Sequence, residues 1–227
     1  MKLAGKTVLI TGAKGGLGTF VTTAFLEAGA QVVGVSRSIA DSDFANPSFR
    51  AIPAELSSLD TARTLMDKAG RVDSVVHLLG GFAGGQSIPE TDDTTFERMF
   101  DLNLRSLFNI VRAVLPRMRS QGSGRLLAIG SKAAGEPSPM SGVYAASKAA
   151  LVSLMRTVAA ENRDRCISAN VILPGTMDTP QNRAANPGAD YSKWVHPAQV
   201  AALLVHLASD EAAQVNGAVI PVFGGDI

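Results

Sequence analysis

The stretch Thr11-Gly12-Ala13-Lys14-Gly15-Gly16-Leu17-Gly18 follows a β-branched run at 7–10 and opens a helical pattern over 16–27. A tight turn from strand to helix needs glycine where the backbone angles exclude other side chains. Backbone N–H groups can approach a pyrophosphate closely only where no Cβ intervenes, and a helix N-terminus favours the anion. The stretch therefore predicts a dinucleotide-binding turn, because it lies between the first strand and the first helix. An ordinary glycine turn is the alternative.

The rest of the chain repeats this alternation of short β-branched runs and longer Ala-rich helical patterns. The predicted strands are 7–10, 31–35, 49–52, 74–79, 125–129, 167–173 and 218–222, and the predicted helices are 16–27, 59–69, 94–119, 142–162 and 197–208. Alternating strands and helices form a parallel sheet covered on both faces. No linker or repeat marks a second domain. The pattern therefore predicts that residues 1–227 form a single doubly wound, Rossmann-type α/β domain with a seven-stranded parallel sheet.

Composition excludes several classes of function. The 21 Lys and Arg residues balance 20 Asp and Glu residues, so no overall field draws the chain to nucleic acid or to an anionic membrane. The chain has neither a run of about 18 apolar residues nor the apolar core of a signal peptide. The single cysteine, Cys166, excludes an intramolecular disulfide and a thiolate zinc cluster. We therefore expect a cytoplasmic protein with a small-molecule substrate, no nucleic-acid or membrane partner and no metal site.

The residues after the second strand decide between the two nicotinamide cofactors. An acidic residue there holds the ribose 2′-hydroxyl, whereas a basic residue accommodates a 2′-phosphate. This chain has Ser36 and Arg37 at that point, and no carboxylate before Asp41. Arg37, assisted by Lys14, favours NADP(H). NAD(H) is the alternative, in which Arg37 is only a solvated surface charge.

Tyr144 and Lys148 are four residues apart in the predicted helix 142–162, so they share one face of it. A phenol with an ordinary pKa near 10 is a poor acid or base at neutral pH, but an adjacent ammonium stabilises the phenolate. The pair predicts a tuned general acid/base. Ser131 follows the strand 125–129 and projects toward the same edge. The alternatives are a chance pair on a helix and a capping serine.

With these residues the chain resembles the short-chain dehydrogenase/reductase family over essentially its whole length. The matching pieces are the glycine-rich turn, Asn103, Ser131, Tyr144 with Lys148, and Pro174-Gly175-Thr176. The resemblance implies that Tyr144 exchanges a proton with the substrate oxygen, Ser131 hydrogen-bonds that oxygen, and Asn103 holds a water in the proton relay. It also implies that Lys148 grips the nicotinamide ribose and lowers the Tyr144 pKa. The implied activity is hydride transfer between NAD(P) and a carbonyl or alcohol; a non-catalytic NADP-binding regulator is the alternative.

The resemblance also implies a wider cofactor-binding set and a homodimer or homotetramer formed through the helices 94–119 and 142–162. The set is Gly12, Lys14, Gly15, Gly16, Leu17, Gly18, Ser36, Arg37, Glu55, Leu56, Gly80, Tyr144, Lys148, Pro174, Gly175 and Thr176. The family usually has Asn-Asn-Ala-Gly after the fourth strand, where this chain has His77-Leu78-Leu79-Gly80. We interpret His77 as a satisfied core histidine; a hydrogen-bonding substitute for the first Asn is the alternative.

Two loops narrow the resemblance further. The glycine-rich loop 80–85 and the polar segment 177–194 look like the quinonoid dihydropteridine reductase branch of the same superfamily. That branch usually lacks a serine equivalent to Ser131 and usually has an acid in place of Arg37, so the substrate can differ despite common descent. The turn-rich segment 177–194 is predicted to form a short substrate lid. Trp194 and Phe82 are expected either to stack a flat heteroaromatic ring or to pack in the core.

Overall fold

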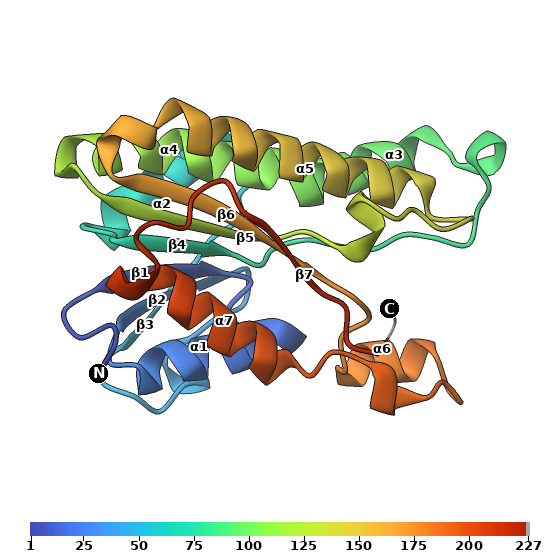
Figure 1. Cartoon of the computed structure of the whole chain (residues 1–227), viewed down its shortest axis with the longest axis horizontal. Helices are drawn as coiled ribbons and strands as arrows, with labels where there is room; N and C mark the ends of the chain where they lie inside the picture. The colour runs from blue at the N-terminus through green and yellow to red at the C-terminus, as the bar shows by residue number, and fades with distance from the viewer. Residues whose placement is uncertain (226–227) are drawn as a thin grey trace.

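The computed structural model describes residues 1–225, and its strands form one parallel sheet in the order β3-β2-β1-β4-β5-β6-β7 (Figure 1). The strands are β1 (Thr7–Thr11), β2 (Gln31–Ser36), β3 (Phe49–Pro53), β4 (Ser74–His77), β5 (Gly124–Ile129), β6 (Ile167–Pro174) and β7 (Val219–Val222). The strand order reverses beside β1, which pairs with β2 on one side and β4 on the other. Ligands of doubly wound sheets bind at this switch point, beyond the carboxyl ends of the strands. The predicted fold class is confirmed.

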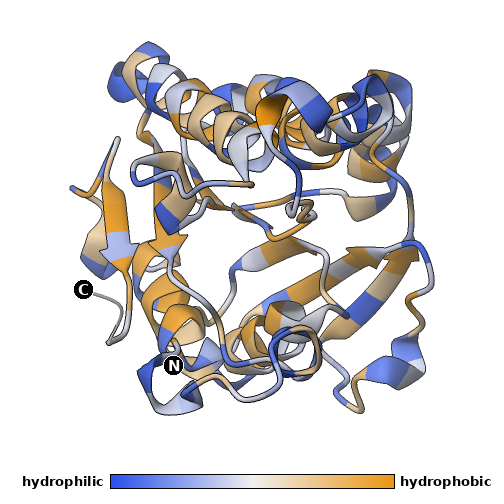
Figure 2. Ribbon diagram, turned by 90° about the vertical axis from the view of Figure 1, so that its right-hand side faces the viewer, coloured by the Kyte–Doolittle hydropathy of each residue, from blue (hydrophilic) through white to orange (hydrophobic). Residues whose placement is uncertain are grey.

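Helices cover both faces of the sheet, as the alternating pattern predicts. On one face lie α2 (Leu59–Ala69), α4 (Ser106–Gln121) and α5 (Gly142–Glu161); on the other lie α1 (Gly16–Glu27) and α7 (Pro197–Ala208) (Figure 1). Successive residues of a strand point to opposite faces, so Leu9 joins the first core whereas Val8 and Ile10 join the second. Figure 2 shows the hydrophobic strands between two helical layers of mixed hydropathy. None of the helices within residues 1–225 has the length and apolar character needed to cross a membrane.

The predicted helix 94–119 is wrong in one respect, because a π-helical turn divides it. The segment consists of α3 (Asp93–Phe100), the π turn Asp101–Arg105 and then α4. The backbone N–H of Ser106 donates to the carbonyl of Asp101, five residues earlier, instead of to that of Leu102. The Ser106 hydroxyl donates to the Leu102 carbonyl at 2.7 Å instead. This insertion turns the buried Asn103 toward the loop that follows β4.

The predicted strand 74–79 is also shortened, since β4 ends at His77. The Thr11 hydroxyl oxygen accepts the backbone N–H groups of Leu78 and Leu79, at 3.2 and 3.4 Å. The Leu78 N–H also donates to the Thr11 carbonyl at 3.1 Å, so the backbone pairing ends at Leu78 and the Thr11 side chain holds the start of the glycine-rich loop.

Candidate active site

Residues 11–18, here called the phosphate turn, require glycine at two positions. Gly12 has a φ of +72°, and its N–H donates to the Val35 carbonyl at 2.8 Å. A Cβ on Gly18 would lie only 2.0 Å from the Gly12 carbonyl oxygen. Gly15 caps α1, so the backbone N–H groups of Gly16 and Leu17 lie at the open end of the helix, where no helical carbonyl is available to them. The turn fits a bound phosphate, because it offers free N–H donors and no side chain to obstruct them.

We expect Gly18→Ala to disrupt the phosphate turn. The added methyl group would overlap backbone atoms of Gly12 and Ala13, which cannot move aside as the end of a side chain can. The expected result is a loss of about 1–3 kcal/mol in the free energy of unfolding and dinucleotide binding weaker by at least about tenfold. Urea unfolding and calorimetric titration measure the two effects. Gly135→Ala is the control, since nothing lies within 4 Å of its added Cβ; equal behaviour of the two variants would contradict the prediction.

The residues beyond β2 form the second part of the predicted cofactor site. Arg37 is exposed, and among residues 1–225 no hydrogen-bond or ion-pair partner holds it. Lys14 is less free than the sequence suggests: its Nζ lies 2.7 Å from Oδ1 of Asp43 and donates to the Ser38 carbonyl at 3.4 Å. Sequence reasoning missed Asp43, because only the three-residue helical turn Asp41–Asp43 brings it back toward the phosphate turn.

The other predicted cofactor residues beside the sheet differ in exposure. Ser36 is half-buried at the end of β2, and Glu55 is exposed. Leu56 is a buried core residue, and its carbonyl accepts the Asn109 side-chain amide at 3.1 Å. At the end of β6, the N–H of Gly175 donates to the Val222 carbonyl at 2.9 Å. These contacts fix the backbone after β3 and after β6.

Asn103 clamps the loop after β4. Its Oδ1 accepts the N–H of Gly81 at 2.9 Å, and its Nδ2 donates to the Gly81 carbonyl at 3.1 Å and to Oγ of Ser147 at 3.0 Å. Gly80 lies in the same cluster, since a Cβ there would be 2.8 Å from Asn103 Oδ1 and 3.2 Å from Lys148 Nζ. Ser147 in turn donates to the Tyr144 carbonyl. Sequence reasoning missed Ser147, although its place beside Lys148 on the helix was a usable signal.

Ser131, Tyr144 and Lys148 meet where β5 ends and α5 begins. Burial raises the pKa of Tyr144, and a hydrogen bond with the Ser131 side chain opposes this effect. Ser131 also caps the helical turn Lys132–Ala134, with its Oγ accepting the Ala133 N–H at 3.2 Å. The buried Lys148 ammonium donates to the Ile129 carbonyl at 3.0 Å, and burial lowers its pKa to about 8. The phenol is therefore held beside a serine hydroxyl. The pKa of Tyr144 is raised rather than lowered, because burial outweighs the hydrogen bond and Lys148 makes no contribution to it, so the expected lowering by Lys148 is wrong for the chain without a bound dinucleotide.

The buried His77 side chain contacts hydroxyl groups on two neighbouring elements of the site. Its Nδ1 lies 3.0 Å from the Thr11 hydroxyl and its Nε2 lies 3.2 Å from the Ser106 hydroxyl. Because Ser106 donates its own proton to the Leu102 carbonyl, the set of partners requires a neutral imidazole with hydrogen on Nε2. Burial, with a smaller contribution from Lys148, lowers the pKa of His77 to about 3. The imidazole thus joins β1 to α4 as a satisfied core histidine, in agreement with our interpretation.

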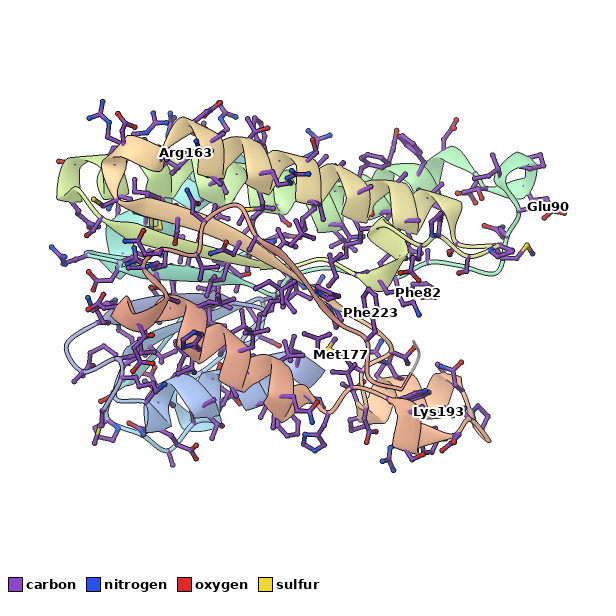
Figure 3. All side chains as sticks on the ribbon, in the orientation of Figure 1. Phe82, Glu90, Arg163, Met177, Lys193 and Phe223 are labelled. Carbon is purple, nitrogen blue, oxygen red and sulfur yellow. The ribbon has the colours of Figure 1, made fainter. Side chains whose placement is uncertain are left out.

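The segment 177–194 lies beyond the carboxyl ends of the strands, on the opposite side of the sheet from the loop that carries Phe82 (Figure 3). It holds the short helix α6 (Pro180–Ala185) and the helical turn Tyr191–Lys193, and a bridge between Met177 and Val195 closes its base. Thr179 contacts the phosphate turn, since a Cβ on Gly16 would lie 3.2 Å from its methyl group.

The aromatic residues Phe82 and Trp194 belong to two separate aromatic pairs. Trp194 packs against Tyr191, with 4.7 Å between ring centroids. Phe82 packs edge to face against Tyr144 at 5.0 Å, while 68% of its surface stays exposed. Phe82 is therefore not a core residue, and the stacking of a flat ring by Phe82 and Trp194 stays a prediction. Within residues 1–225 no group of three His, Cys, Asp or Glu side chains is placed to hold a metal ion.

Known proteins resemble this chain in both sequence and structure. The family model described as short chain dehydrogenase matches residues 6–190. A rhamnolipids biosynthesis 3-oxoacyl-[acyl-carrier-protein] reductase of Pseudomonas aeruginosa is 33% identical, over 98% of this chain and 96% of that protein. A solved short chain dehydrogenase/reductase family protein has a TM-score of 0.92 at 31% identity, covering 100% of this chain and 99% of that one. A 3-ketoacyl-(acyl-carrier-protein) reductase from Brucella melitensis, complexed with NADH, has a TM-score of 0.89 at 26% identity, with 98% of each chain covered.

Proposed function

This chain belongs to the short chain dehydrogenase family and is an oxidoreductase, and from that premise we propose that it moves hydride between a nicotinamide dinucleotide and a carbonyl or alcohol group. The convergence of Ser131, Tyr144 and Lys148 at the carboxyl edge of the sheet carries the proposal. A regulator that only senses the cofactor has no use for a buried ammonium on the same helix as a serine-bonded phenol. We therefore do not retain the non-catalytic alternative.

In the proposed mechanism the nicotinamide supplies the hydride, and the residues of this chain handle the proton. In the direction of reduction, Tyr144 donates its phenolic proton to the substrate oxygen. Ser131 donates a hydrogen bond to that oxygen as negative charge develops on it. The Lys148 ammonium stabilises the phenolate left on Tyr144 and binds the nicotinamide ribose. Asn103 holds the loop at Gly81, and we propose that the water through which the proton is replaced lies beside this residue.

The proposed cofactor site has the phosphate turn at its centre. The N–H groups of Gly16 and Leu17, at the open end of α1, would hold the pyrophosphate. Glu55 and Leu56 would contact the adenine end of the dinucleotide, and Gly80 with residues 174–176 would contact the nicotinamide end. Arg37 and Lys14 favour NADP(H) through the 2′-phosphate, and NAD(H) is the second cofactor.

Two substrate classes are candidates. Two of the relatives named above act, by their names, on 3-oxoacyl or 3-ketoacyl groups, which makes a 3-oxoacyl thioester the first candidate. The second is a quinonoid dihydropterin, suggested by the loop 80–85 and supported by the exposed Phe82 ring against Tyr144. The segment 177–194 serves as the lid for either substrate. Ser131 favours the first class, because carbonyl reduction uses a second hydrogen-bond donor at the oxygen.

The test is the initial rate of NADPH and NADH consumption with a 3-oxoacyl thioester and with a quinonoid dihydropterin. We expect turnover with the thioester and faster consumption of NADPH. Cofactor binding without turnover of either compound, or of a wider panel of ketones and aldehydes, would contradict the proposed activity.

The proposed assembly is a homodimer or homotetramer formed through the outer faces of α4 and α5. Phe108 on α4 is exposed under the Arg112 guanidinium. The outer face of α5 has a hollow of about 600 Å³ lined mainly by small residues and by Arg156 and Arg163. Cytoplasmic location stays a proposal, based on the single Cys166.

A further inference from the structure

An ion pair joins the phosphate turn to the loop beyond β2. Lys14 Nζ lies 2.7 Å from Oδ1 of Asp43, and the same ammonium donates to the Ser38 carbonyl at 3.4 Å. In dinucleotide-binding folds, residues just beyond the second strand contact the ribose hydroxyl or phosphate at the 2′ position. The pair therefore lies where the two nicotinamide cofactors differ from each other.

Asp43 is the fixed member of this pair. Its Oδ2 accepts the backbone N–H of Ala40 at 2.9 Å, and Asp41 anchors the same turn to β3 by accepting the Ala51 N–H at 2.7 Å. The Asp43 side chain is 20% exposed, compared with 47% for Lys14. The hydrogen bonds from Lys14 and from the Ala40 N–H lower the pKa of Asp43, so this carboxyl is ionised at neutral pH. The carboxylate holds its place while the lysine is able to swing away.

The charges at this point favour a 2′-phosphate only in part. Arg37 is exposed and has no ion-pair partner among residues 1–225, so it is available to a phosphate. Lys14 is neutralised by Asp43, and a phosphate beside Lys14 would also meet the negative charge of Asp43. A ribose with a free 2′-hydroxyl carries no charge there, so it is not repelled by Asp43 and does not need Lys14 to leave the ion pair.

We propose that Asp43 is a specificity-determining residue that competes with the 2′-phosphate for Lys14 and thereby limits the preference for NADP(H) over NAD(H). The inference rests on the proposed function, because it concerns the same cofactor site. Binding of NADP(H) requires Lys14 to leave Asp43 or to share its hydrogens with both groups, whereas binding of NAD(H) leaves the ion pair intact.

The experiment is a calorimetric titration of NADP⁺ and NAD⁺, repeated with adenosine 2′,5′-bisphosphate and AMP, on the wild type and on Asp43→Asn. The asparagine oxygen still accepts the Ala40 N–H, so the turn keeps its anchor while the charge is removed. We expect the Kd of NADP⁺ and of the bisphosphate to fall about three- to tenfold, and those of NAD⁺ and AMP to change less than about twofold. Adding Lys14→Ala to Asp43→Asn removes the gain.

Asp41→Asn is the matched control, since it removes a carboxylate from the same turn without touching the ion pair. An equal gain in this control would overturn the inference, because any loss of negative charge would then suffice. An unchanged ratio of the two Kd values in Asp43→Asn, or a shift toward NAD⁺, would also overturn it. Failure of the wild type to bind either dinucleotide would instead reject the proposed function.

Discussion

Tyr144→Phe is expected to lower kcat about a hundred- to ten-thousandfold while the Kd of the dinucleotide stays within about twofold of the wild type. The substitution removes only the phenolic oxygen. The ring keeps its place against Phe82 at 5.0 Å, and the backbone carbonyl still accepts the hydroxyl of Ser147. Without the hydroxyl no protein group donates a proton to the substrate oxygen, so the loss falls on the chemical step. Initial rates and a calorimetric titration separate the two quantities.

Tyr191→Phe is the matched control, because it removes the chain's other tyrosine hydroxyl. That hydroxyl donates to the Asn186 carbonyl at 3.1 Å and lies outside the cluster of Ser131, Tyr144 and Lys148. Tyr191 belongs to the proposed lid 177–194, but its hydroxyl contacts only carbonyl groups of that segment, so we expect kcat in this control to fall by less than about tenfold. A Tyr144→Phe enzyme with kcat close to the wild type would show that another group supplies the proton.

The sheet could be predicted closely from the sequence, because its central strands are buried on both faces. A run such as residues 125–129 is continuously apolar after its first residue, and β5 covers it with one additional glycine at the start. The phosphate turn was equally predictable, since its glycines are required by local backbone angles and close backbone contacts. The elements set by short-range pattern were thus the reliable part of the prediction.

The parts that sequence reasoning missed depend on contacts between distant segments. The π turn within the predicted helix 94–119 depends on Ser106. The hydroxyl of this residue contacts both the Leu102 carbonyl and the imidazole of His77, which lies at the end of strand β4. The pairing of Lys14 with Asp43 depends on how the loop beyond β2 folds back. Helical periodicity carries no signal for either, because both are set by tertiary hydrogen bonds. Asn103 is a similar case. The motif identified this residue, but its hydrogen bonds to Gly81 could not be predicted, because they join distant segments.

Lys148→Met is expected to separate stability from catalysis. The substitution removes the buried ammonium beside Gly80 and Asn103, and we expect kcat to fall at least about a hundredfold, since the phenolate of Tyr144 loses its stabilising charge. The free energy of unfolding should not fall together with kcat. Burial lowers the pKa of Lys148 from 10.5 to about 8, which corresponds to roughly 3 kcal/mol spent on burying the charge at neutral pH. The lost hydrogen bond to the Ile129 carbonyl offsets this by about 1–3 kcal/mol.

The pH dependence of the free energy of unfolding tests whether burial of the Lys148 ammonium lowers the stability of the wild type. Below pH 8 the lysine is protonated in both the folded and the unfolded chain, so it adds no slope. Between about 8 and 10.5 only the unfolded chain keeps the proton, and the free energy of unfolding of the wild type rises with pH on account of Lys148. Lys148→Met lacks this rise, so its advantage at pH 7 should shrink as the pH approaches 10. Urea unfolding of both proteins from pH 6 to 10 measures the difference. A difference that stays constant over this range would mean that the buried ammonium is not what limits stability here.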